Sequence, residues 1–323
     1  MGSRGGIKVG EMMRTILSTV ALCLIATIPA SGGDRPPDKV SFYFAAHADD
    51  WQLFMNPSAF NDVADPATRA VFIHVTAGDA GLGSGNGGRR FPLYQARENG
   101  ADLAIRFMAD ANTPPTTKTS SVRTFNGHAI ERISYRNTVS YFLRVPDGGP
   151  DGAGYAETGH QSLLRLSRGE GGSLLTIDRV TTYRDWGDLV ATLRAIVDSE
   201  RGNAPKVQLN VSELDPNINP HDHPDHQMTA RAALDAARDL GCAQRIHYVD
   251  YASSHLPENL DAHQRDMESA VFGVTLAGVL ALDHAVSWTH YDKSFVGRNY
   301  FRIEEGRGRC DQPASTRTAT VTP

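Results

Sequence analysis

The sequence of 323 residues is poor in cysteine and has no cluster of positive charge. Its 32 Lys and Arg stand against 37 Asp and Glu, which gives a formal net charge of −5. Proteins that bind nucleic acid through its phosphates need clustered positive charge, so we expect no nucleic-acid partner. The glycine-rich segment 78–88 lacks the Lys-Ser/Thr ending of a P-loop, so no P-loop is expected there.

Long apolar runs are also missing, apart from one near the N-terminus that is too short to span a membrane. Arg14 precedes this run, 15–28, which falls short of the ~20 apolar residues that a membrane-spanning helix needs. Small residues follow at 30–32, which completes the order of a secretory signal peptide. An uncleaved anchor is the alternative, and Met12 or Met13 could be the natural start. We expect a secreted, extracellular protein with no stable membrane span after signal removal.

Two of the three cysteines lie outside this N-terminal segment. Cys23 falls within the predicted signal, whereas Cys242 and Cys310 belong to the remainder of the chain. In an exported protein two such cysteines can pair, so we expect a disulfide, with two buried thiols as the alternative.

The remainder of the chain has the composition of an ordinary globular protein. Hydrophobic residues make up 40% and charged residues 21%, and we find no internal repeat or linker. We assign 1–32 to a signal peptide or N-terminal extension, 33–306 to a single domain, and 307–323 to a loose C-terminal tail.

Short apolar runs alternate with segments of helical spacing. The runs 40–44, 71–75 and 207–211 are typical of buried strands, and apolar residues recur at helical spacing in 93–109 and 186–200. This order predicts an α/β fold with a Rossmann-like, mostly parallel sheet flanked by helices. Further expected elements are a strand over 245–251 and helices over 227–240 and 261–282.

The middle of the chain lacks this alternation of buried strands and helices. Segments 128–136 and 138–145 alternate like antiparallel strands, and 146–159 is too rich in glycine and proline for a regular element. We therefore expect a small antiparallel excursion and a mobile Gly-rich flap. Loops over a rigid sheet are common places for substrate contacts.

Chemistry-bearing side chains first cluster at the end of the strand 40–44. His47, Asp49 and Asp50 follow it directly, and ligands bind at the carboxyl ends of strands in open α/β sheets. Neighbouring Asp49 and Asp50 cannot point the same way, so one can bind a metal while the other faces a metal-bound water. A helix N-cap is the simpler alternative for either Asp.

A second cluster, three histidines within six residues, follows the strand 207–211. His221, His223 and His226 stand with two aspartates at a helix start, where capping is again the alternative role. Imidazole and carboxylate are common ligands of catalytic zinc, and three protein ligands leave a position open for water. The two clusters together predict two His and one Asp on a metal, a free carboxylate as base and a spare imidazole. This set suits amide hydrolysis.

These residues resemble the PIG-L/LmbE-like zinc-dependent N-acetylglucosaminyl deacetylases, a similarity that covers most of residues 40–250. It departs from the family pattern at Ala48, where the family usually has Pro, and at Gly100, where an acidic residue is common. The resemblance is carried by the strings His47-Ala48-Asp49-Asp50, His223-Pro224-Asp225-His226, Thr76-x-Gly78-x-x-Gly81 and Leu143-x-x-Pro146-Asp147-Gly148.

The resemblance implies a role for each matching residue. One zinc ion per chain would be held by His47, Asp50 and His226. Asp49 would act as the general base, and His223 would stabilise the tetrahedral intermediate or its leaving group.

The export signal and the Gly-rich flap make the chain most like the glycopeptide-antibiotic (teicoplanin-type) pseudoaglycone deacetylases. The implied substrate is an N-acetylglucosaminylated small molecule or glycopeptide. Arg97 matches a family Arg that could contact the sugar, and aromatic residues would suit a broad cleft. The candidate substrate-binding residues are Arg97, Trp51, His221 and Trp288.

Two other functions remain open at this point. Residues 221–226 also fit the His-x-His-x-Asp-His string of metallo-β-lactamase-like binuclear hydrolases, which would leave residues 47–50 without a role. A non-catalytic secreted carbohydrate-binding protein is the second alternative. Zinc counting and acetate release separate these functions.

Overall fold

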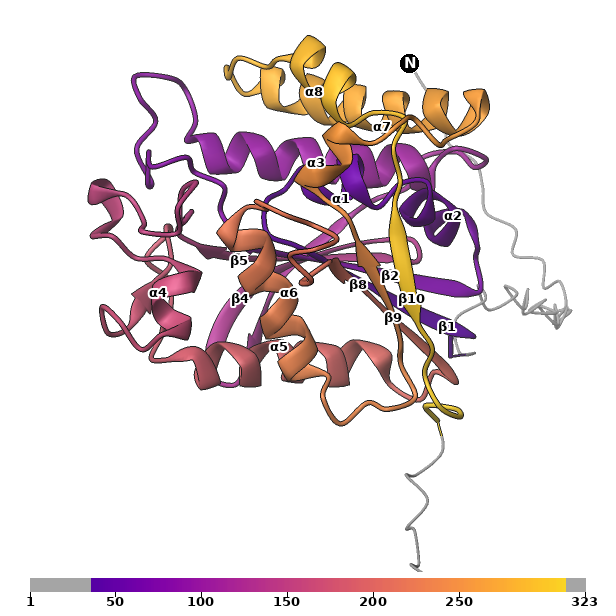
Figure 1. Cartoon of the computed structure of the whole chain (residues 1–323), viewed down its shortest axis with the longest axis horizontal. Helices are drawn as coiled ribbons and strands as arrows, with labels where there is room; N and C mark the ends of the chain where they lie inside the picture. Colours follow the sequence, from indigo (N-terminus) through magenta and orange to yellow (C-terminus); the bar gives the residue numbers. More distant parts are fainter. Residues whose placement is uncertain (1–35, 312–323) are drawn as a thin grey trace, which may run out of the picture. The chain divides into compact units, whose positions relative to one another are not determined.

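A mixed eight-stranded sheet is the centre of the computed structural model, which describes residues 36–311 (Figure 1). Its strands are β1 (Lys39–Ala45), β2 (Thr68–Thr76), β3 (Thr119–Phe125), β4 (His128–Tyr135), β5 (Thr138–Val145), β8 (Lys206–Ser212), β9 (Gln244–Tyr248) and β10 (Phe301–Glu304). Their order is β10-β9-β8-β1-β2-β5-β4-β3, with the five strands from β9 to β5 parallel. A separate antiparallel pair is formed by β6 (Leu174–Leu175) and β7 (Thr182–Tyr183). The predicted mostly parallel α/β sheet is confirmed.

Helices cover both faces of the sheet (Figure 1). They are α1 (Asp50–Phe54), α2 (Ser58–Ala64), α3 (Leu93–Ala109), α4 (Leu163–Ser167), α5 (Trp186–Arg201), α6 (Pro224–Ala236), α7 (Ala262–Ala281) and α8 (Trp288–Ser294), with short 3₁₀ turns at η1 (Ala156–Thr158) and η2 (Tyr251–His255). One core lies between the sheet and α5 and α6, and a second lies on the face of α1, α2, α3 and α7.

The central strand β1 contributes alternate side chains to the two cores. Val40, Phe42 and Phe44 point toward the α5 side, whereas Tyr43 and Ala45 belong to the other core. Successive side chains of a strand leave on opposite faces, so a strand covered on both faces reads as a continuous apolar run. This explains why 40–44 was predictable as a buried strand that delivers His47 to the carboxyl edge.

Several predicted elements match closely, and others differ at their ends. The helix expected over 93–109 has those bounds, and the helix expected over 261–282 is α7. The expected helix 227–240 instead begins at Pro224, because His223 caps it and proline suits the first helical position. Strand β3 was not predicted, since its sequence TSSVRTF has little apolar content and most of it is exposed.

Glycine at position 100 is required where α3 crosses α7. A Cβ added to Gly100 would lie 2.6 Å from the Thr275 carbonyl oxygen, and one added to Gly278 would lie 2.7 Å from the Gly100 Cα. The two helices therefore touch backbone to backbone at this crossing. An acidic side chain at position 100 could not fit, which gives the departure at Gly100 a packing cause.

The expected disulfide between Cys242 and Cys310 is present. It joins the segment before β9 to the last described residues, and the Cys310 backbone N–H also donates to the Pro205 carbonyl at 3.0 Å. Residues up to 311 are thus attached to the sheet at this point. The predicted signal 1–32 and residues 312–323 lie outside the described residues. Among the helices of residues 36–311, none is both long and apolar enough to cross a membrane.

Candidate metal centre

The turn after β1 fixes the side chain of Asp50. Its Oδ2 accepts a 2.7 Å hydrogen bond from the His47 backbone N–H, and Asp50 is the first residue of α1. Asp49 stands at the N-cap position of α1, but its side chain makes no capping bond. The capping alternative for Asp49 is therefore not what the structure shows, and its carboxylate pairs with Arg97 instead.

The start of α6 fixes the two histidines of the second cluster. The Nδ1 of His223 accepts a 3.1 Å hydrogen bond from the Asp225 backbone N–H, so the His223 side chain caps the helix. His226 lies in the first turn of α6 and is fully buried. The ends of β1 and β8 are close because the two strands pair in parallel, and this pairing brings the two clusters together.

Three of these side chains form a group that could hold a metal ion, namely His47, Asp50 and His226. The Asp50 Oδ1 lies 3.5 Å from the His47 Nδ1 and 3.3 Å from the His226 Nε2. Zinc–ligand bonds of about 2.0–2.2 Å at tetrahedral angles place ligand atoms about 3.3–3.6 Å apart. The distances from Asp50 to the two histidines fall in this range, and all three donor atoms lie within 4.8 Å of one another.

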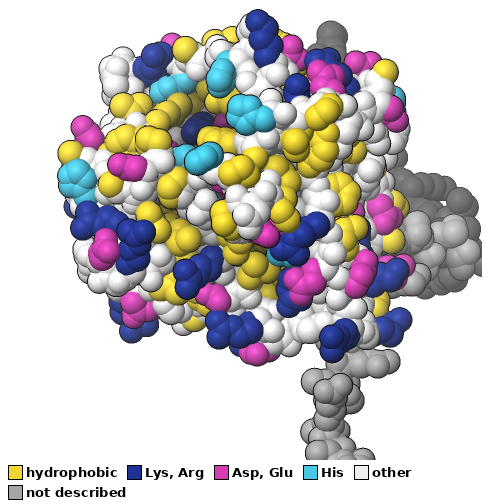
Figure 2. Space-filling model, viewed as in Figure 1, with side chains coloured by type: hydrophobic (Ala, Val, Ile, Leu, Met, Phe, Trp, Pro, Cys, Tyr) yellow, Lys and Arg dark blue, Asp and Glu magenta, His cyan; other side chains and the backbone are white. Residues whose placement is uncertain are grey.

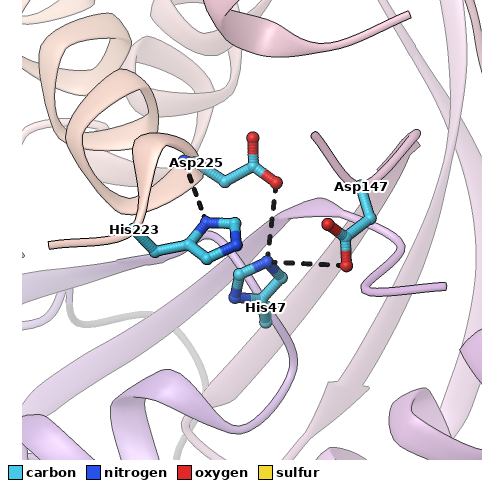
Figure 3. A group of neighbouring side chains, drawn as sticks. All are labelled: His47, Asp147, His223 and Asp225. Carbon is cyan, nitrogen blue, oxygen red and sulfur yellow. Dashed lines mark hydrogen bonds and ion pairs between the residues drawn. The ribbon is translucent and has the colours of Figure 1, made fainter. Parts of the chain in front are cut away.

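Each of the two histidines turns its other ring nitrogen toward further carboxylates. The His226 Nδ1 lies 2.8 Å from the Asp222 Oδ1 and 3.4 Å from the Asp250 Oδ2. The His47 Nε2 lies 3.5 Å from the Asp225 Oδ2 and 3.9 Å from the Asp147 Oδ2, as Figure 3 shows. Histidines that bind metals have this arrangement, in which the outer carboxylate fixes the tautomer and ring orientation.

Unpaired buried atoms also favour a metal. The His226 Nε2 is buried and has no hydrogen-bond partner. Burying a polar atom without a partner is unfavourable, and an ion coordinated by this nitrogen would remove the deficit. Imidazole nitrogens with one carboxylate oxygen are a donor set that suits zinc.

A second possible group overlaps the first at His47. His47, Asp147, His223 and Asp225 also bring one donor atom each within 4.8 Å of one another (Figure 3). In this group both carboxylates accept backbone N–H bonds, Asp147 from Gly149 and Asp225 from Gly148, each at 2.8 Å, as Asp50 does in the first group. The first group is favoured for two reasons. Both of its histidines turn one ring nitrogen toward Asp50, and both turn the other ring nitrogen toward a further carboxylate.

Ionisation of the metal-free site follows from burial and the surrounding carboxylates. Burial lowers the pKa of His47, but Asp50 and its other acidic neighbours outweigh burial and raise the pKa to about 10. His226 follows the same pattern, with a pKa raised by Asp50 and Asp222 against the effect of burial. Metal binding needs neutral imidazoles, so a metal at this site competes with these protons.

His223 behaves in the opposite way. Burial, followed by the positive charge of His47, lowers the pKa of His223 to about 4. The ring is therefore neutral at pH 7, and because its Nδ1 accepts a hydrogen bond, its proton lies on Nε2. His223 can thus donate a hydrogen bond while remaining uncharged.

A cavity of about 150 Å³ opens above these residues. Figure 2 shows a hollow in the upper part of the drawn face, with histidine side chains at its margin. Asp49 and Arg97 stand on one wall, where Arg97 also donates to the Gly78 carbonyl at 2.9 Å. The lining consists of His47, Asp49, Asp50, Leu53, Phe54, Arg97, Asp147, Tyr155, His223, Tyr251 and Tyr291.

Three of the predicted substrate-binding residues lie outside this cavity lining. Trp51 is fully buried, and its Nε1 donates to the His74 Nε2 at 3.2 Å, so the prediction of a substrate contact is wrong for Trp51. Its aromatic ring packs against Phe72 in the hydrophobic core. His221 is exposed, and Trp288 packs on Phe272.

Sequence reasoning assigned no role to Asp147 or Asp250. Asp147 lies in the string Pro146-Asp147-Gly148, which was recognised as a pattern, whereas Asp250 has no signal except its place after β9. Three residues before Asp147, the Arg144 backbone has φ of 56°. A bidentate contact with Glu98, at 2.7 and 2.8 Å, holds the Arg144 side chain. Glu98 therefore supports the loop and does not face the cavity.

Comparisons with known proteins found a distant structural similarity. No protein-family model matches the sequence, and no curated protein matches it. One similar solved structure is an N,N'-diacetylchitobiose deacetylase from Pyrococcus horikoshii, with 13% identity and a TM-score of 0.46. The alignment covers 83% of this chain and 84% of that chain. A likeness at this level carries no argument about fold or activity.

Proposed function

We propose that the chain is a zinc-dependent N-deacetylase that hydrolyses the N-acetyl group of an N-acetylglucosaminyl unit. One observation carries this proposal: an oxygen of Asp50 lies 3.5 Å from a ring nitrogen of His47 and 3.3 Å from one of His226, at an open cavity. Two further groups with acid–base chemistry, Asp49 and His223, line the same cavity. The resemblance in sequence supplies the substrate class.

Zinc, when bound, would lower the pKa of water to about 7 and polarise the acetyl carbonyl. Asp49 accepts the proton of the attacking water, since its carboxylate lines the cavity beside Asp50. Arg97 holds the Asp49 carboxylate on the cavity wall. The amide C–N bond then breaks, and the proton taken by Asp49 passes to the leaving amine, which releases acetate.

His223 stabilises the negative charge that develops on the acetyl oxygen. Its neutral ring carries a proton on Nε2, because Nδ1 accepts from the Asp225 N–H. Preorganised donors aimed at a developing oxyanion are among the largest contributions to catalysis. Asp225, buried beside His223, fixes the orientation of this ring through its backbone N–H.

We further propose a glycopeptide pseudoaglycone as the carrier of the sugar. The sequence resemblance supports this substrate, and so do the three tyrosines of the lining, Tyr155, Tyr251 and Tyr291. Aromatic side chains offer large apolar faces with a polar tip, which suits a sugar attached to an aromatic aglycone. Asp49, followed by burial, raises the pKa of Tyr291 to about 12, so its hydroxyl stays a donor.

Export is part of the same proposal. The disulfide between Cys242 and Cys310 supports it, because disulfides persist mainly in oxidising compartments.

Acetate release tests the proposed reaction. Purified protein is incubated with N-acetylglucosaminyl acceptors, including a glycopeptide, with and without chelator, and acetate is quantified. We expect release that chelator abolishes and added zinc restores. Absence of release from every N-acetyl sugar and glycopeptide would favour a carbohydrate-binding protein without catalysis.

A binuclear hydrolase is the second candidate, because two of the three possible donor groups share His47 and the third, Asp222, His226 and Asp250, shares His226 with one of them. Metal analysis of the purified chain distinguishes it from the deacetylase. One tightly bound zinc per chain agrees with our proposal, and two would contradict it.

A further inference from the structure

A larger cavity, of about 370 Å³, lies away from the metal centre. It is found near the start of β2 and the end of α5, whereas the metal centre follows the carboxyl ends of β1 and β8. Three arginines, Arg69, Arg123 and Arg132, contribute to its lining. We call it the arginine recess.

The sheet register places these arginines on one face. Arg132 pairs with Tyr141 across β4 and β5, and Arg123 pairs with Ile130 across β3 and β4. Ile130 and Tyr141 belong to the core on the α5 side, and directly paired residues point to the same face. The guanidinium groups of three strands therefore converge under the end of α5.

The recess has too little negative charge to balance its three arginines. Glu200 supplies the one carboxylate of the lining, and it pairs with Arg69 and Arg132 and accepts a 2.5 Å hydrogen bond from the Tyr141 hydroxyl. Within residues 36–311, the Arg123 side chain has no ion pair or hydrogen bond, and the Arg69 Nε is buried without a partner. Three positive charges against one negative charge leave a surplus of two.

We propose that the arginine recess binds a divalent oxyanion, as inorganic phosphate or sulfate or as the ester group of a larger ligand. Guanidinium groups present planar arrays of N–H donors that match tetrahedral oxyanions in geometry and charge. The surplus charge equals that of the ligand, and the exposed guanidinium of Arg123 would gain a partner. This site is independent of the deacetylase proposal.

Calorimetric titration of the full zinc-loaded chain with phosphate, and separately with sulfate, tests the proposal. We expect saturable binding that weakens as ionic strength rises. Arg123→Gln removes an exposed, unpaired charge and should weaken binding about tenfold, the value of one charge-assisted hydrogen bond. Arg168→Gln is the matched control, since Arg168 is exposed and lies outside the lining.

For a second variant we expect the affinity for the anion to change in the opposite direction. Glu200→Gln removes the one negative charge of the recess, so it should tighten anion binding, with thermal unfolding confirming that the variant is folded. Phosphate bound at the metal centre would be unaffected by Arg123→Gln, so the two sites are distinguished. Equal affinity of the wild-type chain and Arg123→Gln, or no saturable binding of either anion, would overturn the proposal. If phosphate binds and sulfate does not, the natural ligand is a phosphate or phosphomonoester.

Discussion

The floor and the wall of the cavity contain adjacent aspartates in opposite environments. On the floor, Asp50 is buried and faces the imidazoles of His47 and His226. On the wall, Asp49 is partly exposed and pairs with Arg97. The two carboxylates leave a single turn in different directions, so one chain segment supplies both parts of the site.

The different environments of the two aspartates suit different roles. Asp50 is placed to bind a metal ion, and Asp49 is placed to act on the substrate. On the floor, the carboxylate of Asp50 is buried beside two imidazoles, and a bound ion would compensate its charge in place of the protons on His47 and His226. Groups on the wall keep contact with the cavity and can exchange protons with water and substrate. Variants of floor residues and of wall residues test whether the two sets act separately.

The largest effect is expected from a change on the floor. His226→Ala removes one of three proposed ligands, so bound zinc should be lost and acetate release should fall below detection. Metal content per chain, measured by elemental analysis, checks the first effect. His221→Ala is the control, because His221 is exposed and does not line the cavity, and it should retain zinc and activity.

A change of the proposed base on the wall should affect turnover and leave the metal in place. Asp49→Asn is expected to lower kcat by about 10²–10⁴-fold, the usual contribution of a general base, with one zinc still bound. Steady-state kinetics and metal analysis on the same sample provide the measurement. Loss of zinc in Asp49→Asn would show that the roles of the two aspartates are wrongly divided.

A smaller loss is expected when the partner of Asp49 is changed. Arg97→Gln keeps the floor intact but removes the ion pair and the hydrogen bond to the Gly78 carbonyl. We expect about a tenfold decrease in kcat, the value of one charge-assisted hydrogen bond, and partial recovery in Arg97→Lys. An unchanged kcat in Arg97→Gln would mean that Asp49 needs no support from the wall.

The last prediction concerns the pH dependence of stability in the metal-free protein and involves no change in catalysis. The pKa of His47 is raised from 6.5 to about 10, so its protonated form stabilises the metal-free fold fully below pH 6.5. This contribution is lost as pH rises toward 10, and the unfolding free energy should fall over that interval. Denaturant titrations at several pH values check the slope. With zinc bound, protons compete with the metal, so stability should instead fall as the solution becomes acidic.

Local sequence patterns predicted the strands that are buried on both faces and the helices that have one regular apolar face. The run 40–44 is buried on both faces and was recognisable, and the helix over 93–109 had clear apolar spacing. Strand β3 escaped prediction because an exposed edge strand needs little apolar content. Trp51 was misassigned because an aromatic residue beside a site can face either the cavity or the core, and only tertiary packing decides.

The proposed metal ligands could be predicted from the sequence. The carboxylates that contact these ligands could not. His47, Asp50 and His226 follow strand ends or begin a helix, and the sheet brings such positions to one edge. Asp147 and Asp250 also follow strands, but a lone aspartate after a strand is too common to indicate a role. Their importance depends on distances to the two histidines, which only the fold provides.

The most direct test is a crystal structure of the zinc-loaded chain with anomalous data collected at the zinc absorption edge. We predict one anomalous peak per chain, bonded to the His47 Nδ1, an Asp50 oxygen and the His226 Nε2. A peak at the His47 Nε2 with His223, Asp147 or Asp225 as ligands, or two peaks per chain, would contradict the assignment of floor and wall.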